Sequence, residues 1–255
     1  MKLRLTWPVL LGLGALSGTN AVTAAPAASL GERLARAAPE ANATVLKQAA
    51  SAMMCASSHD PVAPRRLAVI DYSRPSTQRR LWLFDLNTAT LLDAEWVAHG
   101  RGSGDNTPTS FSNRPGSYQS SLGLFQTGVT YQGGNGYSLR LEGLEPGIND
   151  LAASRAIVIH GADYVSESSI HSLGRLGRSL GCPALRRTVA RRLIDELAGG
   201  QYVYAYYPDP AWLSSPAANH CATSTAGTPA PAASRSPGKA TAAVHRAARA
   251  QAGQH

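Results

Sequence analysis

Two residues that can carry covalent chemistry lie in one stretch of the sequence, RAIVIHGADYVSESSIHSLGRLGRSLGCPALRR, residues 155–187. A short apolar run leads to His160, and Cys182 follows in a passage rich in Gly and Ser, between a glycine and a proline. A thiol attacks as the thiolate, and its ordinary pKa of about 8.5 leaves little thiolate at neutral pH, so a partner base is needed. The pair predicts a nucleophile at Cys182 with His160 as its general base, together at the mouth of an open cleft.

The residues next to Cys182 fit the needs of acyl transfer. Gly181 permits close backbone approach, and the backbone N–H groups of Gly181 and Cys182 could bind a developing oxyanion. Arg175 and Arg178 could hold a substrate carboxylate or lower the pKa of the thiol. The alternative is structural, because a cysteine between Gly and Pro is often buried filler and a histidine at a strand end is often a satisfied polar group.

The elements that must position these residues are mostly strands. Short apolar or alternating runs, separated by Pro, Gly, Asn and Ser, predict strands at residues 67–72, 80–86, 91–98, 124–131, 137–141, 156–160 and 201–207. Many short strands favour an antiparallel sandwich or barrel over an alternating α/β fold. His160 would end one strand, and the loop after it is long enough to bring Cys182 back beside it.

Two helices are expected around these strands. The apolar residues between positions 45 and 54 have the spacing of one helix face, with a start near Asn42 and Thr44. Residues 188–197 predict a short amphipathic helix that ends at Gly199 and Gly200. The expected fold is mostly β with short helices, preceded by an N-terminal helix that packs on the body.

The N-terminus has the layout of a secretory signal peptide. Lys2 and Arg4 precede an apolar run at residues 9–16 and small residues at 22–25. No later segment approaches the roughly 18 apolar residues that a membrane-spanning helix needs. We therefore expect a periplasmic or secreted protein without an integral membrane segment once the signal is removed.

The three cysteines suit an exported protein. An odd number suggests one disulfide and one thiol that is kept free. Cys55 ends the N-terminal helical pattern and Cys221 lies just beyond the globular pattern, whereas Cys182 lies inside the Gly-rich passage. We expect a bridge between Cys55 and Cys221, although sequence alone leaves the other pairings open.

The formal charge of +8 suggests a nucleic-acid partner at first sight. Two of these charges belong to the signal region and four to the acid-free tail from Ser214 onward, which leaves about +2 for the body. A nearly neutral body excludes a dedicated phosphate binder, so we expect no nucleic-acid partner. The predicted domains are a signal peptide at 1–25, a helical segment at 29–60, a catalytic domain at 65–213 and a disordered Ala/Pro/Ser-rich tail at 214–255.

Three blocks of the sequence together resemble the murein L,D-transpeptidase catalytic domain family. IVIHGADYVS followed by GRLGRSLGCPAL is similar to the family signature, in which a histidine on a strand is followed by Ser-x-Gly-Cys. AHGRGSGDNTPTSFSNRPGSYQSSLGLFQTG and LRLEGLEPGIND resemble blocks of one branch of the family. The resemblance covers roughly residues 67–207.

This resemblance implies a mostly β cysteine acyltransferase that acts on peptidoglycan stem peptides, with no metal or organic cofactor. Cys182 would attack the diaminopimelate carbonyl of a tetrapeptide stem and expel the terminal D-Ala, and the acyl group would pass to an amine on another stem or to water. His160 would act as base and then as acid, oriented by a backbone carbonyl. Ser179 and Gly181 would belong to the motif around the nucleophile.

The motif departs from the better-known Ser/Thr-His-Gly-Cys pattern at one position. Leu180 replaces the second histidine and removes a donor, so His99 or His171 could substitute in space. Arg101, in HGRGSG, is a further candidate for binding the substrate carboxylate. The departure leaves two alternatives open: an L,D-carboxypeptidase or related cysteine hydrolase, and a non-catalytic wall-binding module of the same fold.

Overall fold

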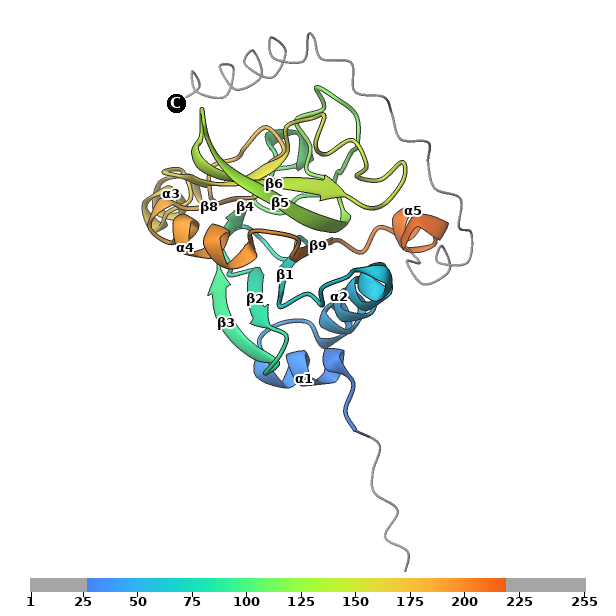
Figure 1. Ribbon diagram of the computed structural model, residues 1–255. Coiled ribbons are helices and arrows are strands. Elements are labelled where there is room, and N and C mark those ends of the chain that lie inside the picture. Colours follow the sequence, from blue (N-terminus) through green and yellow to red (C-terminus); the bar gives the residue numbers. More distant parts are fainter. Residues whose placement is uncertain (1–26, 219–255) are drawn as a thin grey trace, which may run out of the picture.

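The computed structural model describes residues 27–218 (Figure 1). The expected signal peptide, most of the expected tail and Cys221 lie outside the described residues. Within the described part, a nine-stranded sheet dominates. Its strands are β1 Arg66–Asp71, β2 Leu81–Asp85, β3 Thr90–Glu95, β4 Val97–Ala98, β5 Gly123–Gly133, β6 Gly136–Gly143, β7 Val158–Ala162, β8 Ala184–Arg186 and β9 Tyr202–Tyr206. The mostly β architecture with short helices is confirmed.

The strand order requires the sheet to curve until its two edges nearly meet. The order is β3-β2-β1-β9-β5-β6-β7-β8-β4, so β3 and β4 are the edge strands. Only Trp96 separates these two strands in the sequence, and the residues on either side of it lie at most about 7 Å apart. The sheet is therefore nearly closed, like a barrel.

Two strand pairs differ from the antiparallel pattern expected from the sequence. The pairs β1–β9 and β7–β8 are parallel, whereas the other neighbours are antiparallel. A parallel pair needs a long crossover connection rather than a hairpin. The crossover from β7 to β8 contains α3 Glu167–Leu173, and it is the segment that separates His160 from Cys182.

Five α-helices border the sheet in the described part (Figure 1). The expected N-terminal helix is α2, which begins after Asn42, whose Oδ1 accepts the N–H of Thr44 at 2.9 Å. It packs against β1 and β9. The helical segment expected at 29–60 also contains a separate first helix, α1, which starts with a capping box between Ser29 and Glu32. The helical elements are α1 Leu30–Ala37, α2 Ala43–Ala56, α3, α4 Arg187–Leu197, α5 Pro210–Leu213 and the 3₁₀ turns η1 Ser57–His59, η2 Arg101–Ser103 and η3 Pro216–Ala218.

The two faces of β7 pack on different apolar clusters. Ile159 belongs to the large core cluster, on the face that α4 covers. Ala162 belongs to a small cluster that also contains Ala184 of the neighbouring strand. Because side chains alternate along a strand, His160 points to the face of the small cluster.

The block LRLEGLEPGIND holds separate parts of the chain together. The buried carboxylate of Glu145 accepts the N–H of Leu124 at 2.7 Å and the indole N–H of Trp212 at 2.6 Å. The side chain of Asn149 donates to the carbonyls of Leu122 and Leu124. These bonds fasten α5 and the start of β5 to one loop.

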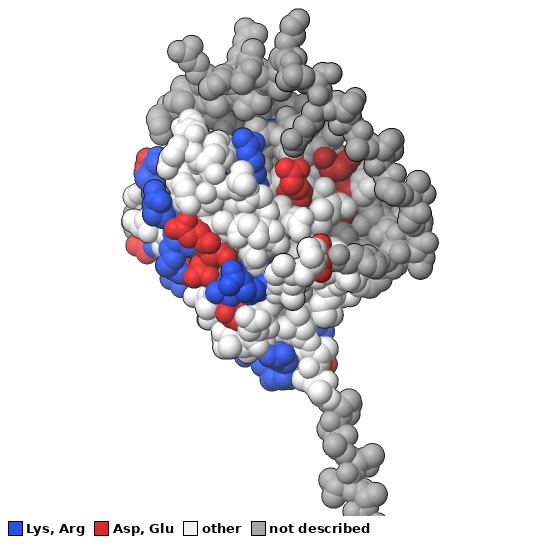
Figure 2. Space-filling model, in the orientation of Figure 1, with Lys and Arg blue, Asp and Glu red and all other residues white. Residues whose placement is uncertain are grey.

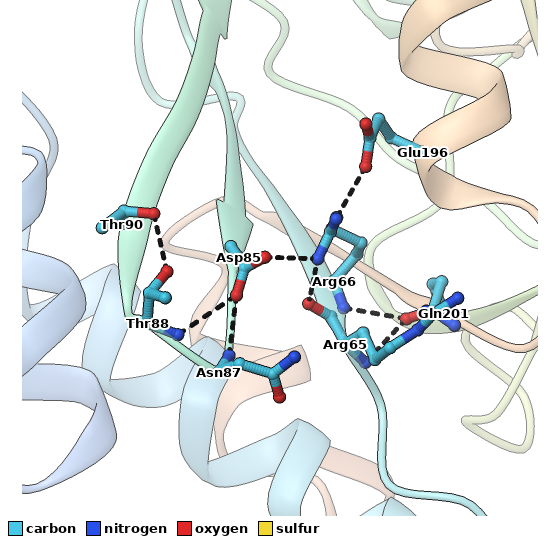
Figure 3. Close-up of polar contacts among 8 residues, drawn as sticks. All are labelled: Arg65, Arg66, Asp85, Asn87, Thr88, Thr90, Glu196 and Gln201. Atoms are coloured by element: carbon cyan, nitrogen blue, oxygen red, sulfur yellow. Dashed lines mark hydrogen bonds and ion pairs between the residues drawn. The ribbon is translucent and has the colours of Figure 1, made fainter.

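A second polar group, which we call the Arg66 clamp, consists of Arg66, Asp85, Glu196 and Gln201 (Figure 3). The guanidinium of Arg66 pairs with Asp85 and Glu196, both at 2.7 Å. The Oε1 of Gln201 accepts the backbone N–H groups of Arg65 and Arg66 at 2.8 Å. The clamp joins β1, β2, α4 and the segment that leads into β9.

The visible surface carries charges of both signs. On the face shown in Figure 2, acidic and basic side chains lie next to one another rather than in one basic patch. This arrangement agrees with the nearly neutral body expected from the sequence. None of the helices in residues 27–218 has the length and apolar character needed to cross a membrane.

Candidate active site

His160 lies inside β7 rather than at its end, and its ring orientation is fixed by the backbone. Its Nδ1 is 3.1 Å from the carbonyl oxygen of Gly161. A carbonyl can only accept a hydrogen bond, so Nδ1 carries the proton and Nε2 is left as the basic nitrogen. The backbone carbonyl thus orients the imidazole, as an aspartate side chain orients the histidine of a Ser-His-Asp triad.

The environment of His160 keeps the imidazole neutral. Burial lowers the pKa of His160 below its ordinary value of 6.5, and the nearby charge of Arg187 acts in the same direction. The hydrogen bond to Gly161 opposes this shift. A neutral imidazole can accept a proton at neutral pH, as a general base must.

Cys182 is the free cysteine among the described residues. Its Sγ donates to the carbonyl oxygen of Ala156 at 3.6 Å. Cys55, in contrast, is disulfide-bonded. Its expected partner, Cys221, lies outside the described residues, so the pairing stays a prediction.

The sheet places His160 on β7 and Cys182 just before β8, the parallel neighbour of that strand. His160 is paired with Ala184 in the β7–β8 register, and Cys182 is two residues before Ala184. Residues two apart share a face where the chain is extended. A Cβ atom on Gly181 would point instead at Ile157 of the large core cluster. Both arguments put Cys182 on the face to which His160 points.

The pair is not open to solvent, contrary to the expectation of a cleft mouth. Cys182 is 1% exposed and His160 is 4% exposed. The burial of both side chains comes from tertiary packing, which the sequence pattern alone does not show.

Ser179 shapes the backbone around Cys182. Its hydroxyl donates to the carbonyl of Cys182 at 2.6 Å and accepts the N–H of Gly181 at 3.1 Å. The Gly181 N–H is therefore occupied in this structure and does not point into an oxyanion pocket. The hydroxyl of Ser120 donates to the carbonyl of Gly181 at 3.0 Å and fixes the same turn from the other side.

The segment that begins at His99 supports this turn. The backbone N–H of Ser179 donates to the His99 carbonyl at 2.9 Å, and the N–H of Arg101 donates to the Ser179 carbonyl at 2.7 Å. Between them, Gly100 has no room for a side chain, because a Cβ atom there would lie 2.8 Å from the Cα of Gly181. The HGRGSG block therefore supports the cysteine turn through its backbone.

Two of the predicted substrate-binding arginines are already paired. Arg175 Nε lies 2.6 Å from Asp105 Oδ1, and Arg178 Nη1 lies 3.4 Å from the same atom. Arg178 also donates to the carbonyl of Gly104 at 2.8 Å. Their charges hold two loops together, so their geometry does not favour the predicted role of binding a substrate carboxylate.

The two histidines proposed as substitutes for the missing donor differ in their surroundings, and that role stays a prediction for both. His99 is 1% exposed, and its Nδ1 lies 2.8 Å from Nη2 of the buried Arg80. It is an interior residue rather than a surface one. His171 is exposed on α3.

Arg101 is exposed and lies over the ring of Tyr118, with 4.4 Å between its Cζ and the ring centroid. Substrate binding by Arg101 stays a prediction.

Three residues near the thiol were missed by the sequence interpretation. Arg155, Tyr72 and Tyr164 all interact electrostatically with Cys182. Burial raises the pKa of Tyr72 to about 12 and raises that of Tyr164 as well, so both phenols stay protonated at neutral pH. Arg155 and Tyr164 flank the histidine strand, a sequence signal that could have identified them. Tyr72 is distant in sequence and gave no signal.

The described residues contain no group of three or more His, Cys, Asp or Glu side chains that could hold a metal ion.

The family model of the L,D-transpeptidase catalytic domain matches residues 37–206, which is more than half of the chain. The chain therefore belongs to the L,D-transpeptidase catalytic domain family. The match begins before α2 and so extends further toward the N-terminus than the motifs indicated.

Solved L,D-transpeptidase structures are similar at a distance. One from Mycobacterium smegmatis is 13% identical, with a TM-score of 0.35 over 56% of this chain and 59% of that one. One from Stackebrandtia nassauensis is 13% identical, with a TM-score of 0.36 over 70% and 77%. The chain spans less than two thirds of the length of the mycobacterial protein. No curated protein matches the chain.

Proposed function

We propose that this protein is an L,D-transpeptidase that acts on peptidoglycan tetrapeptide stems through a Cys182 acyl-enzyme. The family assignment supports the reaction class. The N-terminal signal pattern supports a site of action outside the cytoplasm, in the periplasm or the secreted space. His160 serves as general base in this proposal.

The first half of the reaction forms a thioester. His160 Nε2 takes the thiol proton, and Sγ attacks the carbonyl carbon of the diaminopimelate residue, which pushes an electron pair onto the oxygen. The oxyanion then collapses and breaks the C–N bond to the terminal D-Ala. The imidazolium returns the proton to the departing amine, so D-Ala leaves with its amino group intact.

The second half restores the thiol. An amine of a neighbouring stem attacks the thioester carbonyl, and His160 takes a proton from that amine. The C–S bond breaks, and the imidazolium gives its proton to the sulfur. If water takes the place of the amine, the same steps yield a tripeptide stem, which is the L,D-carboxypeptidase alternative.

One observation carries the proposal: the contact of His160 Nδ1 with the Gly161 carbonyl, which leaves Nε2 as a proton acceptor on the strand beside Cys182. Burial and the resulting neutral imidazole add to it. The bond from Ser179 to the Cys182 carbonyl keeps the nucleophile turn in one conformation. A thiol next to a neutral, oriented imidazole is the arrangement that cysteine acyl transfer needs.

The test is the intact mass of the protein after exposure to a carbapenem. Wild type should gain the mass of one opened carbapenem, mapped by peptide mass to Cys182, because the acyl-enzyme resembles that of the substrate. Cys182→Ala should gain nothing, and Cys182→Ser, which keeps the size of the side chain, should react far more slowly. Equal adducts in wild type and Cys182→Ala would refute the nucleophile.

A second measurement separates the activities. Incubation of wild type with a disaccharide tetrapeptide should give cross-linked dimers and free D-Ala. Tripeptide without dimers would assign the carboxypeptidase reaction instead. A protein that neither forms the carbapenem adduct nor releases D-Ala would be a binding module of the same fold.

A further inference from the structure

The guanidinium of Arg155 reaches the backbone beside Cys182. Arg155 precedes β7, and its Nη2 lies 3.6 Å from the position that a Cβ atom on Gly181 would occupy. The next residue, Ala156, supplies the carbonyl that accepts the hydrogen bond from Cys182 Sγ. Two consecutive residues therefore border the cysteine turn, one with a charged side chain and one with its backbone.

The partners of Arg155 are all electrically neutral. Its guanidinium donates to the carbonyls of Ser112 and Gln119, both at 2.6 Å, and to the hydroxyls of Ser121 at 2.6 Å and Ser117 at 3.2 Å. Within residues 27–218, no carboxylate forms an ion pair with it. Arginine stays protonated in proteins, so this half-buried charge is not cancelled by an acid.

The backbone next to Arg155 is strained. Ala156 has φ +55°, in the left-handed region that residues with a side chain seldom adopt. Tyr118, in the loop that Arg155 holds, has φ +54°. Strain of this kind costs free energy and persists where the surrounding structure imposes it, often at functional sites. Here the strained residues are the one that follows Arg155 and one in the loop to which its guanidinium donates.

We propose that Arg155 is a positioning residue that stabilises the thiolate of Cys182 and fixes the loop at residues 112–121 against the cysteine turn. The inference rests on the proposed function, since it concerns the same nucleophile. Arg155 interacts electrostatically with Cys182, and a nearby opposite charge favours the ionised form of an acid, by roughly one to three pKa units. Arg155 would thereby raise the fraction of thiolate at neutral pH.

The other charged or titratable groups around the thiol do not offer the same effect. Tyr72 and Tyr164 stay neutral because burial raises the pKa of each phenol. His160 is neutral because burial lowers the pKa of its imidazole. Two further arginines interact with these groups rather than with the thiol itself. Arg80 interacts with Tyr72. Arg187 pairs with Asp163 and also interacts with Tyr164 and His160.

The test is the pH dependence of Cys182 alkylation by iodoacetamide. The rate rises as the thiol ionises, so its midpoint reports the pKa of the thiol. In Arg155→Gln the midpoint should rise by on the order of one pH unit or more. Arg155→Lys, which keeps the charge without the planar fork, should shift it less. A purely structural role would change the rate at every pH without moving the midpoint.

Ser117 offers a matched pair that leaves Arg155 in place. Ser117→Asp puts a carboxylate beside Nη2 and should raise the midpoint, whereas Ser117→Asn should leave it near that of wild type. This pair decides the question if Arg155→Gln does not fold, as judged by its melting temperature. An unchanged midpoint in Ser117→Asp, or in folded Arg155→Gln, would overturn the inference.

The proposed function is judged separately. Carbapenem acylation of wild type at Cys182 tests it and does not depend on the midpoint in any variant. A shifted midpoint without acylation would leave the electrostatic role standing and refute the acyltransferase. Normal acylation of wild type together with an unmoved midpoint in the variants would support the acyltransferase and overturn the electrostatic role of Arg155.

Discussion

Two arginines of this domain differ in what surrounds them. Arg66 pairs with the carboxylates of Asp85 and Glu196 at a partly exposed position (Figure 3). Arg155 donates to two carbonyls and two hydroxyls, next to the turn that carries Cys182. The first arginine is neutralised by two acids, and the second is solvated by neutral oxygens.

The electrostatic consequences are opposite. The hydrogen bond to Glu196 raises the pKa of Arg66, so the positive charge is stabilised by its partners. Burial lowers the pKa of Arg155, while its interaction with Cys182 acts in the other direction. An arginine whose partners are neutral keeps its charge available for a nearby anion. This difference separates an arginine that joins elements from one that can act on a nucleophile.

The same distinction separates Arg155 from two of the arginines predicted to bind substrate. Arg175 and Arg178 are closer to Cys182 in sequence than Arg155 is, but both contact Asp105. Asp105 offsets the charge of both arginines where the two loops meet. Distance along the sequence therefore says less about electrostatic influence than the chemistry of the partners.

The largest predicted effect separates a residue assigned to the reaction from an arginine that stabilises the fold. His160→Ala should lower the rate of carbapenem acylation by on the order of 10² or more, because a general base is lost. Arg66→Gln should leave that rate within about twofold, since this partly exposed group joins β1, β2 and α4 and makes no contact with Cys182 that the structure records. Stopped-flow or time-resolved mass measurements would show both. Near-normal acylation by His160→Ala would refute the assigned base.

A third arginine extends the comparison into the interior. Arg80 is fully buried and donates to the carbonyls of Val97 and Arg74 and to His99 Nδ1, again without a carboxylate. Burial, with the charge of Arg80, lowers the pKa of His99 to about 3. His99 must then stay neutral in the folded state while it protonates below 6.5 when unfolded.

This linkage predicts acid-sensitive stability. The unfolded state binds the extra proton between pH 6.5 and about 3, so stability is lost as pH falls through that window. Between pH 7.5 and 5 the loss attributable to His99 should be on the order of 2 kcal/mol. Urea unfolding of wild type and His99→Asn, which keeps an acceptor for Arg80, would measure it. An equally steep pH dependence in the variant would contradict the assignment.

Much of the fold was accessible from sequence because its strands are apolar runs bounded by turn residues. The β2–β3 hairpin and α4 lie where the pattern placed them. The pattern missed β8, which is only three residues long, and α3, whose Ser-rich sequence has little helical periodicity. Parallel pairing was missed because it is decided by the crossover connection, not by the strand residues.

The candidate site likewise contains residues that the sequence indicates and residues that it does not. His160 and Cys182 could be found because their residue types and the flanking glycines are unusual in combination. Arg155 could not be ranked above Arg175, because its role depends on four neutral partners from a loop that lies more than 30 residues earlier in the chain. Burial of the pair also depends on tertiary packing, which local patterns do not encode.

The smallest predicted effect tests the other side of the comparison, the Arg66 clamp. Arg66→Gln should lower the free energy of unfolding by about 1 kcal/mol at low salt, and by less at high salt, because added ions screen the pairs with Asp85 and Glu196. Lys47→Gln, which breaks the more exposed pair with Glu32, is the matched control and should cost less. Urea unfolding at two salt concentrations measures both. A salt-independent loss in Arg66→Gln would mean that its packing or its bond to the Arg65 carbonyl, rather than its charge, stabilises the junction of β1, β2 and α4.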